Sequence, residues 1–94
     1  MQKSVHTKEY KALRAELRAV REAAGLSQRD LATKLDVPHS WVAKVEAGER
    51  RIDIVEFSWL VAACGQEPNV VFGKLFARDT KKAAGGRSVG GQTR

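Results

Sequence analysis

A break in helical periodicity at residues 36–38, Asp-Val-Pro, constrains the fold of this chain more than any other feature. Proline disfavours helical geometry in the residue before it, so a helix that reaches Leu35 cannot run on through Val37. A new helical pattern begins directly after the proline, and Gly48 ends it because glycine readily takes the left-handed conformation that closes helices. The sequence therefore predicts two short helices joined by a tight turn, at residues 27–35 and 39–47.

These two helices meet the physical requirements of a helix-turn-helix. Ala32 is small enough for the helices to cross closely. Asp36 is one of the few residues other than glycine that tolerate positive φ, and Val37 follows it as an apolar anchor. Val42 and Val45 would fix the second helix to the core, which leaves its opposite side free to enter a DNA major groove.

A longer helix is predicted before this unit, from Thr7 to Gly25. Apolar residues recur there at steps of three and four, as on one face of a helix. This predicted face consists of Tyr10, Leu13, Leu17, Val20 and Ala24. Ser27 and Asp30 then resemble a capping box, with aspartate in place of the preferred glutamate or glutamine.

A fourth helix is predicted after a charged loop. Asp53 and Glu56 form a second capping box at its start, and Gly65 closes it. The predicted buried side consists of Ile54, Phe57, Leu60, Val61 and Cys64.

Residues 69–76 allow two interpretations. Pro68 suits the first position of a helix, whereas Val-Val-Phe-Gly could form a short strand and Gly73 weakens the helical pattern. We favour a helix. The chain is then an all-α domain of four to five helices over residues 7–79, between a frayed segment 1–6 and a disordered, glycine-rich basic tail 80–94.

Composition limits the class of protein. The chain has 94 residues, enough for one domain, and a net charge of +6, which favours a polyanionic partner. Four basic residues and no acidic ones lie in the predicted tail, which leaves the domain itself at +2. The prediction of nucleic-acid binding therefore depends on the helix-turn-helix pattern more than on charge.

No feature of the sequence indicates an enzyme, a cofactor or a metal site. Cys64 is the single cysteine, so an internal disulfide is excluded and a reducing compartment is expected. Neither a signal peptide nor an apolar run of the roughly 20 residues that span a membrane is present, so we expect a cytoplasmic protein. His6, His39 and Cys64 do not form a plausible catalytic set.

The whole pattern resembles the XRE family, the lambda-repressor and Cro type of helix-turn-helix domain. GLSQ, the spaced Leu-Ala and Leu of the second helix, and VEAGER occur in family order, and the resemblance covers residues 13–75. Two positions depart from the family pattern. Asp36 stands where glycine is usual, and Pro38 stands where serine or threonine usually begins the recognition helix.

The resemblance implies a sequence-specific regulator of transcription, most simply a repressor, that binds double-stranded DNA. It places base contacts on the outer face of the third helix, at His39, Ser40, Ala43 and Lys44. Contacts to the DNA backbone fall on Gln28, Arg50 and Arg51. An ion pair between Arg21 and Glu46 is expected to orient the recognition helix. Trp41 is left with two interpretations: it covers the edge of the core, or it lies against the DNA backbone or a thymine methyl.

Apolar residues near the C-terminus exceed the needs of so small a core. The resemblance implies that they form a homodimer interface, at Trp59, Val71, Phe72 and Phe76. Such a dimer would present its recognition helices roughly 34 Å apart and bind a palindromic operator. One alternative is an antitoxin that holds a toxin through this surface and represses its own operon. Another is a protein-interaction module that has lost DNA binding.

Overall fold

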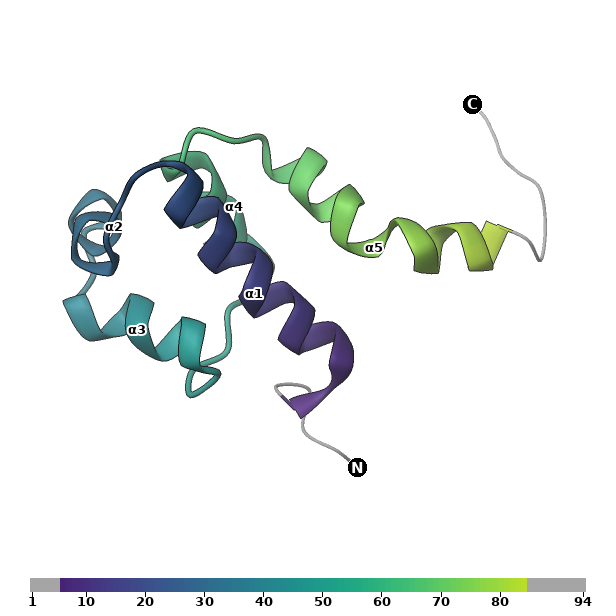
Figure 1. The fold of residues 1–94 in the computed structure, drawn as a ribbon, viewed down its shortest axis with the longest axis horizontal. Coiled ribbons are helices and arrows are strands. Elements are labelled where there is room, and N and C mark those ends of the chain that lie inside the picture. Colours follow the sequence, from purple (N-terminus) through teal and green to yellow (C-terminus); the bar gives the residue numbers. More distant parts are fainter. Residues whose placement is uncertain (1–5, 85–94) are drawn as a thin grey trace.

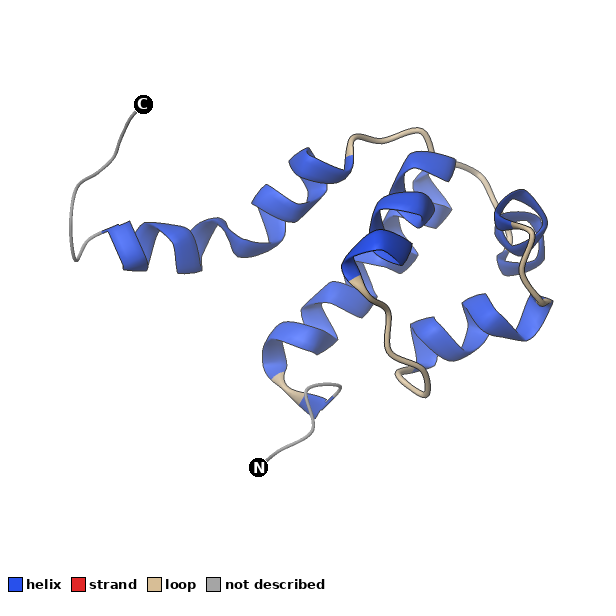
Figure 2. Ribbon diagram, turned by 180° about the vertical axis from the view of Figure 1, so that it is seen from behind, coloured by secondary structure: helices blue, strands red, loops and turns tan. Residues whose placement is uncertain are grey.

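Five helices and no strands make up the part of the chain that the computed structural model describes, residues 6–84. In chain order they are α1 (Lys8–Ala23), α2 (Gln28–Leu35), α3 (His39–Ala47), α4 (Ile54–Ala63) and α5 (Pro68–Ala84). The first four surround a common core, and the second half of α5 extends away from them (Figures 1 and 2). The all-α prediction is confirmed, and residues 69–76 are helical.

Helix α1 begins where the sequence predicts. The hydroxyl of Thr7 accepts a hydrogen bond from the Tyr10 N–H at 3.1 Å and so caps the first turn. Leu17 and Val20 are buried, at 0% and 2% exposure. Ala24, which was predicted on the same face, is exposed because the helix has already ended at the residue before it.

Both predicted capping boxes form. At α2 the Ser27 hydroxyl accepts from the Asp30 N–H at 3.0 Å, and an Asp30 oxygen accepts from the Ser27 N–H at 3.0 Å. The hydrogen bonds from the Ser27 backbone and hydroxyl hold the pKa of Asp30 below its ordinary value. At α4 the reciprocal bonds of Asp53 and Glu56 measure 2.8 and 3.0 Å. Residues three positions apart therefore determine where these helices start.

The turn between α2 and α3 has the predicted geometry. Asp36 lies in the left-handed region, with φ 58° and ψ 47°, and the Val37 N–H donates to the Ala32 carbonyl at 3.0 Å. Pro38 is extended, with φ −60° and ψ 146°, and supplies no side-chain cap to α3. An aspartate thus takes the conformation that usually needs glycine, at some cost in backbone energy.

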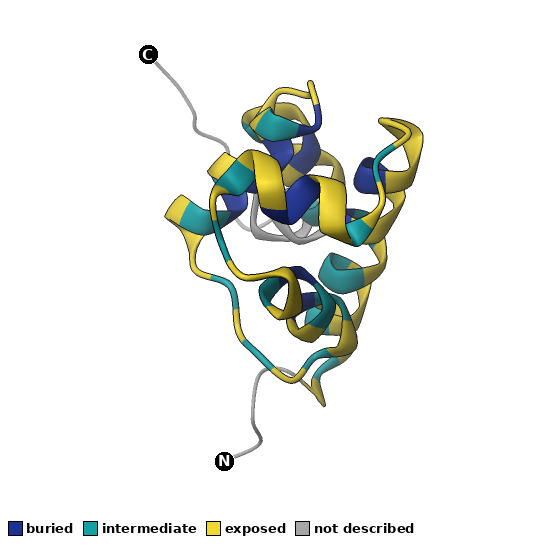
Figure 3. Ribbon diagram, turned by 90° about the vertical axis from the view of Figure 1, so that its left-hand side faces the viewer, coloured by how far each residue is buried: buried dark blue, intermediate teal, exposed yellow. Residues whose placement is uncertain are grey.

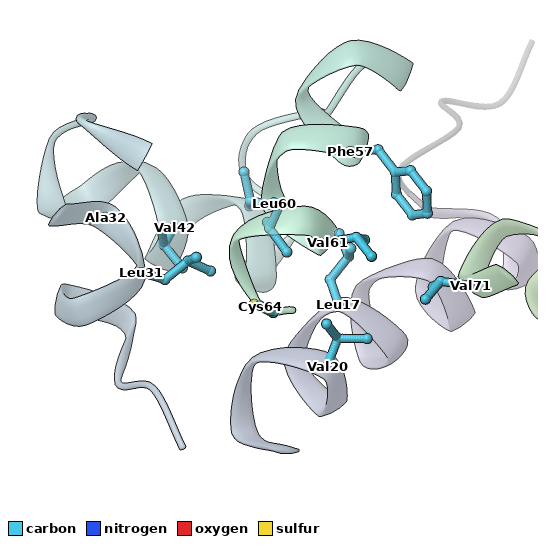
Figure 4. Close-up of a cluster of buried hydrophobic side chains, with 11 residues drawn as sticks. Leu17, Val20, Leu31, Ala32, Val42, Phe57, Leu60, Val61, Cys64 and Val71 are labelled. Atoms are coloured by element: carbon cyan, nitrogen blue, oxygen red, sulfur yellow. The ribbon is translucent and has the colours of Figure 1, made fainter. Parts of the chain in front are cut away.

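The core lies between α1, α2, α3 and α4, with one contribution from α5 (Figure 4). Buried positions face inward on each helix and exposed positions face outward (Figure 3). The buried members of the core are Leu17, Val20, Leu31, Ala32, Val42, Val45, Phe57, Leu60, Val61, Cys64 and Val71. Ile54 was predicted to be buried but is 63% exposed, because it is the first residue of α4 and the core begins one turn later at Phe57.

Helix α5 packs on the bundle through its first turns. Lys74 forms an ion pair with Glu16 of α1 at 2.9 Å, and Phe76 breaks the helical geometry with φ −116° and ψ 15°. The helix then runs on to Ala84, so it includes residues 80–84 of the predicted tail. Residues 1–5 and 85–94, on which the rest of the predicted frayed segment and tail fall, lie outside the described residues.

Candidate nucleic-acid interface

The outward face of α3 carries the residues predicted to contact bases. Val42 and Val45 are fully buried and fix the rotation of this helix about its axis. A period of 3.6 residues then turns Ser40 and Lys44 outward, and both are exposed. His39, the first residue of the helix, is exposed as well. Ala43 lies beside them and is half-buried.

The polar groups on this face are available to a ligand. Within residues 6–84 the side chains of His39, Ser40 and Lys44 make no hydrogen bond or ion pair. Lysine donates to guanine O6 or N7, serine donates or accepts, and the methyl of alanine suits a thymine methyl. The face thus combines a cation, neutral hydrogen-bonding groups and a small apolar contact.

Arg21 and Glu46 form the predicted ion pair behind this face. Arg21 Nε lies 2.7 Å from Glu46 Oε2, and Nη2 lies 3.0 Å from Oε1. The remaining guanidinium nitrogen, Nη1, donates to the Leu26 carbonyl oxygen at 2.8 Å. The hydrogen bond to Glu46 raises the pKa of Arg21 against the opposing effect of burial. The pair joins α1 to α3 and so fixes the position of α3 relative to α1.

Gln28 has a role that the sequence did not indicate. Its Nε2 donates to Glu46 Oε1 at 2.9 Å, so this side chain belongs to the same polar group as the ion pair. An amide nitrogen has two N–H groups, so one is left for a phosphate. The bond spans 18 positions in sequence, which is why only the folded chain reveals it.

The Arg50 side chain, which was predicted to contact phosphate, is hydrogen-bonded to other residues of the protein. Its two terminal nitrogens donate to the two Glu56 carboxylate oxygens at 3.2 and 3.1 Å, and one also donates to the Arg51 carbonyl at 2.8 Å. The guanidinium holds the pKa of Glu56 below its ordinary value, with help from the Asp53 N–H. Arg51, by contrast, is exposed, and its side chain makes no hydrogen bond or ion pair within residues 6–84.

Trp41 lies under Arg50. The Arg50 Cζ is 4.9 Å from the centre of the indole ring, a cation–π arrangement. The ring is half-buried and packs against the core, which agrees with the first interpretation of Trp41. Because part of the residue remains accessible, contact with a DNA backbone stays a prediction.

Exposed apolar side chains gather on α4 and the start of α5. Trp59 is 58% exposed and Phe72 is 45% exposed. Two shallow apolar hollows, of about 260 and 120 Å³, lie beside Phe72, and Ile54 and Phe57 line both. Of the predicted dimer residues, Phe76 is half-buried, with its ring 4.8 Å from that of Phe72.

Val71 is a correction to that predicted set. It is 2% exposed and part of the core, so it cannot meet a second copy of the chain. Three consecutive apolar residues, 70–72, lie near the start of α5, and periodicity within so short a run does not indicate which one faces inward.

A close helix crossing, a left-handed turn and an outward second helix define the class of this domain: it is a helix-turn-helix. The chain matches the model of the helix-turn-helix domain family over residues 12–71. It is also similar to the solved structure of an XRE-family like protein from Pseudomonas syringae pv. tomato str. DC3000. The two share 39% sequence identity with a TM-score of 0.74, and the match covers 80% of this chain and 92% of that one. No curated protein sequence matches the chain.

The chain therefore belongs to the helix-turn-helix domain family and is of the XRE type. Its fold is that of DNA-binding regulators of transcription. No helix within residues 6–84 is both long enough and apolar enough to cross a membrane.

Proposed function

We propose that this protein is a sequence-specific repressor that binds a palindromic operator as a homodimer, with α3 in the major groove. The observation that carries the proposal is the contrast between two groups of α3 residues. Glu46 is held by Arg21 and Gln28 at 2.7–3.0 Å. His39, Ser40 and Lys44 are exposed and have unused hydrogen-bonding groups. A fixed helix with unpaired polar groups is suited to reading base edges.

Contacts to the DNA backbone would flank this face. Arg51 is the best candidate because it is exposed and unpaired within residues 6–84. Arg50 has N–H groups beyond those bonded to Glu56, and Gln28 keeps one amide N–H. Contacts of this kind orient the protein on the duplex without reading its sequence.

The homodimer would form through the exposed apolar side chains of α4 and the start of α5, namely Ile54, Val55, Trp59, Val70 and Phe72. Exposed apolar surface marks a site of protein interaction where it is contiguous. A small domain also gains stability when a second copy covers such surface. Two-fold symmetry would then place two copies of α3 on the same side of the duplex, one helical turn apart.

Selection of bound sites from random duplex DNA is the most direct test. The expected result is a palindrome with half-site centres about 10 base pairs apart, as dimer geometry requires. The affinity for that operator should fall linearly with the logarithm of salt concentration, because phosphate contacts release counterions. No enrichment of any sequence, together with affinity independent of salt, would refute the proposal.

Two substitutions separate base contacts from backbone contacts. Lys44→Ala should relax the preference at one base pair, at a cost of about 1–3 kcal/mol. Arg51→Ala should weaken binding to all DNA sequences alike. It should also reduce the slope of log affinity against log salt concentration by about one unit. The two variants remove the same charge from neighbouring surfaces, so each serves as the control for the other.

An antitoxin that also represses its own operon is the second candidate. The hollows beside Phe72 favour it, because a partner protein could bind there instead of a second copy. Purification of the chain together with the product of a neighbouring gene would support this candidate. A pure homodimer that is unaffected by that product would count against it.

A further inference from the structure

Arg14 lies across the C-terminal end of the recognition helix. Its Nη1 donates to the main-chain carbonyl of Glu46 at 3.2 Å, over a separation of 32 positions. The last carbonyls of a helix have no partner within the helix. Backbone N–H groups after the helix bond to the carbonyls of Lys44 and Val45. The next carbonyl along the helix is that of Glu46, and it accepts its hydrogen bond from the Arg14 guanidinium.

Gly48 makes this contact possible. A Cβ at this position would lie 2.8 Å from both Cζ and Nη1 of Arg14, closer than side chains approach one another. Gly25 has a similar φ, 74° against 80°, but a Cβ there would have nothing within 4 Å. A side chain at residue 48 would therefore displace the Arg14 guanidinium from this position, whereas one at residue 25 would displace nothing.

The contact of Arg14 with α3 has both an unfavourable and a favourable contribution to stability. Within residues 6–84 the Arg14 Nε is buried without a hydrogen-bond partner, and an unpaired buried donor costs free energy. In return, a cation sits against the negative end of the α3 dipole.

Arg14 and Arg21 are seven positions apart, which places them on the same face of α1. Both bind Glu46: Arg21 binds the carboxylate and Arg14 binds the main-chain carbonyl. The first contact holds a side chain of α3, and the second holds the backbone at its end. The C-terminal end of α3 is therefore held at Glu46 through both its side chain and its backbone.

We propose that Arg14 is a positioning residue that sets the direction in which α3 enters the major groove. It thereby determines how well the protein discriminates its operator from other DNA. This inference rests on the proposed DNA-binding function. A small rotation of α3 would displace His39 and Lys44 at its outer face together, so several base contacts would weaken at once.

The test measures the affinity of the intact chain for its selected operator and for a random duplex of equal length. The variants are Arg14→Ala and Arg14→Lys, with Arg18→Ala as the control. Arg18 has the same charge on the same helix, and its side chain is 64% exposed. All measurements are made over a range of salt, at a temperature where every variant is folded.

The ratio of the two affinities should fall about tenfold in Arg14→Ala, on the order of one weakened base contact. The control should leave this ratio unchanged. Arg14→Lys should retain part of the ratio, because lysine keeps the charge and can donate a hydrogen bond but lacks the planar guanidinium group.

An unchanged ratio of the two affinities in Arg14→Ala would overturn the inference, and it could arise in two ways. Equal weakening on both duplexes, with a lower salt slope, would make Arg14 a phosphate contact. A lower unfolding temperature with an unchanged ratio would make it a merely structural residue. If the wild-type chain itself fails to discriminate, the proposed function fails and the inference fails with it. Discrimination that Arg14→Ala retains in full would remove the inference alone.

Discussion

Arg21 Nε lies 2.7 Å from Glu46 Oε2, and the two side chains are only 9% and 5% exposed. This buried pair connects the longest helix of the core bundle to the recognition helix. Burial makes the pair costly to break, because either partner alone would be an uncompensated charge away from water. The same carboxylate also accepts a hydrogen bond from Gln28, so three helices meet at Glu46.

Glu46→Ala should therefore lower the free energy of unfolding by about 3–5 kcal/mol, the usual cost of leaving one buried charge unpaired. Binding to the operator should weaken as well, because α3 loses two of its side-chain contacts. Thermal unfolding and operator titration would measure the two effects. Glu49→Ala is a suitable control, since that residue is exposed and its side chain makes no hydrogen bond or ion pair with the described residues. Thermal unfolding at the wild-type temperature in Glu46→Ala would exclude this role.

Glu56 should contribute to the pH dependence of stability. The hydrogen bond from Arg50, and then that from the Asp53 N–H, lower its pKa from the ordinary value of 4.5. A carboxylate whose pKa is lower in the folded state stabilises the fold above its unfolded pKa. That contribution is lost as the pH falls through the folded value.

Glu56→Gln should accordingly be less stable than wild type at pH 7, and the difference should shrink below about pH 4.5. Urea unfolding at a series of pH values from 7 to 3 would measure it. Glu49→Gln, at an exposed position in the same loop region, is the control. A difference that stays constant down to pH 3 would contradict the assignment.

Gly48→Ala should be more destabilising than Gly25→Ala, although both glycines have positive φ. Alanine in the left-handed region costs roughly 1–2 kcal/mol at either site. Only at residue 48 must the added methyl also displace Arg14. In an Arg14→Ala background the extra cost should disappear, and the two substitutions should become equivalent. Denaturant unfolding of the full double-mutant cycle would measure the coupling; additive effects would mean that the close approach has no energetic consequence.

Trp59→Glu should convert the proposed dimer to a monomer, because it places a charge in an apolar interface. Sedimentation should show half the mass at micromolar concentration, and the unfolding temperature should lose its dependence on protein concentration. The side chain is 58% exposed in the single chain, so the fold itself should survive. Ala12→Glu adds the same charge at an exposed position of α1 and should leave the assembly intact. A wild-type chain that is already monomeric at these concentrations would refute the proposed interface.

Features that depend on neighbours in sequence could be predicted from the sequence. The capping boxes at Ser27 and Asp53, the left-handed turn at Asp36 and the helix end at Gly48 involve residues within about four positions of one another. Their energies are local, so the residue types alone indicate the geometry. The outward face of α3 follows equally from the periodicity of Val42 and Val45. The Arg21–Glu46 pair was expected from the family resemblance, because neither residue indicates the other by spacing.

Contacts between distant segments were decided only by the tertiary structure. Arg14 and Gln28 reach Glu46 across 32 and 18 positions, and many charged side chains on α1 would have suited that role equally well. The direction in which α5 packs decides that Val71 is buried while Phe72 is exposed. Such outcomes depend on how close two helices lie and on which side chains meet between them. Residue type and spacing do not determine these quantities, because they arise only when the helices pack around a shared core.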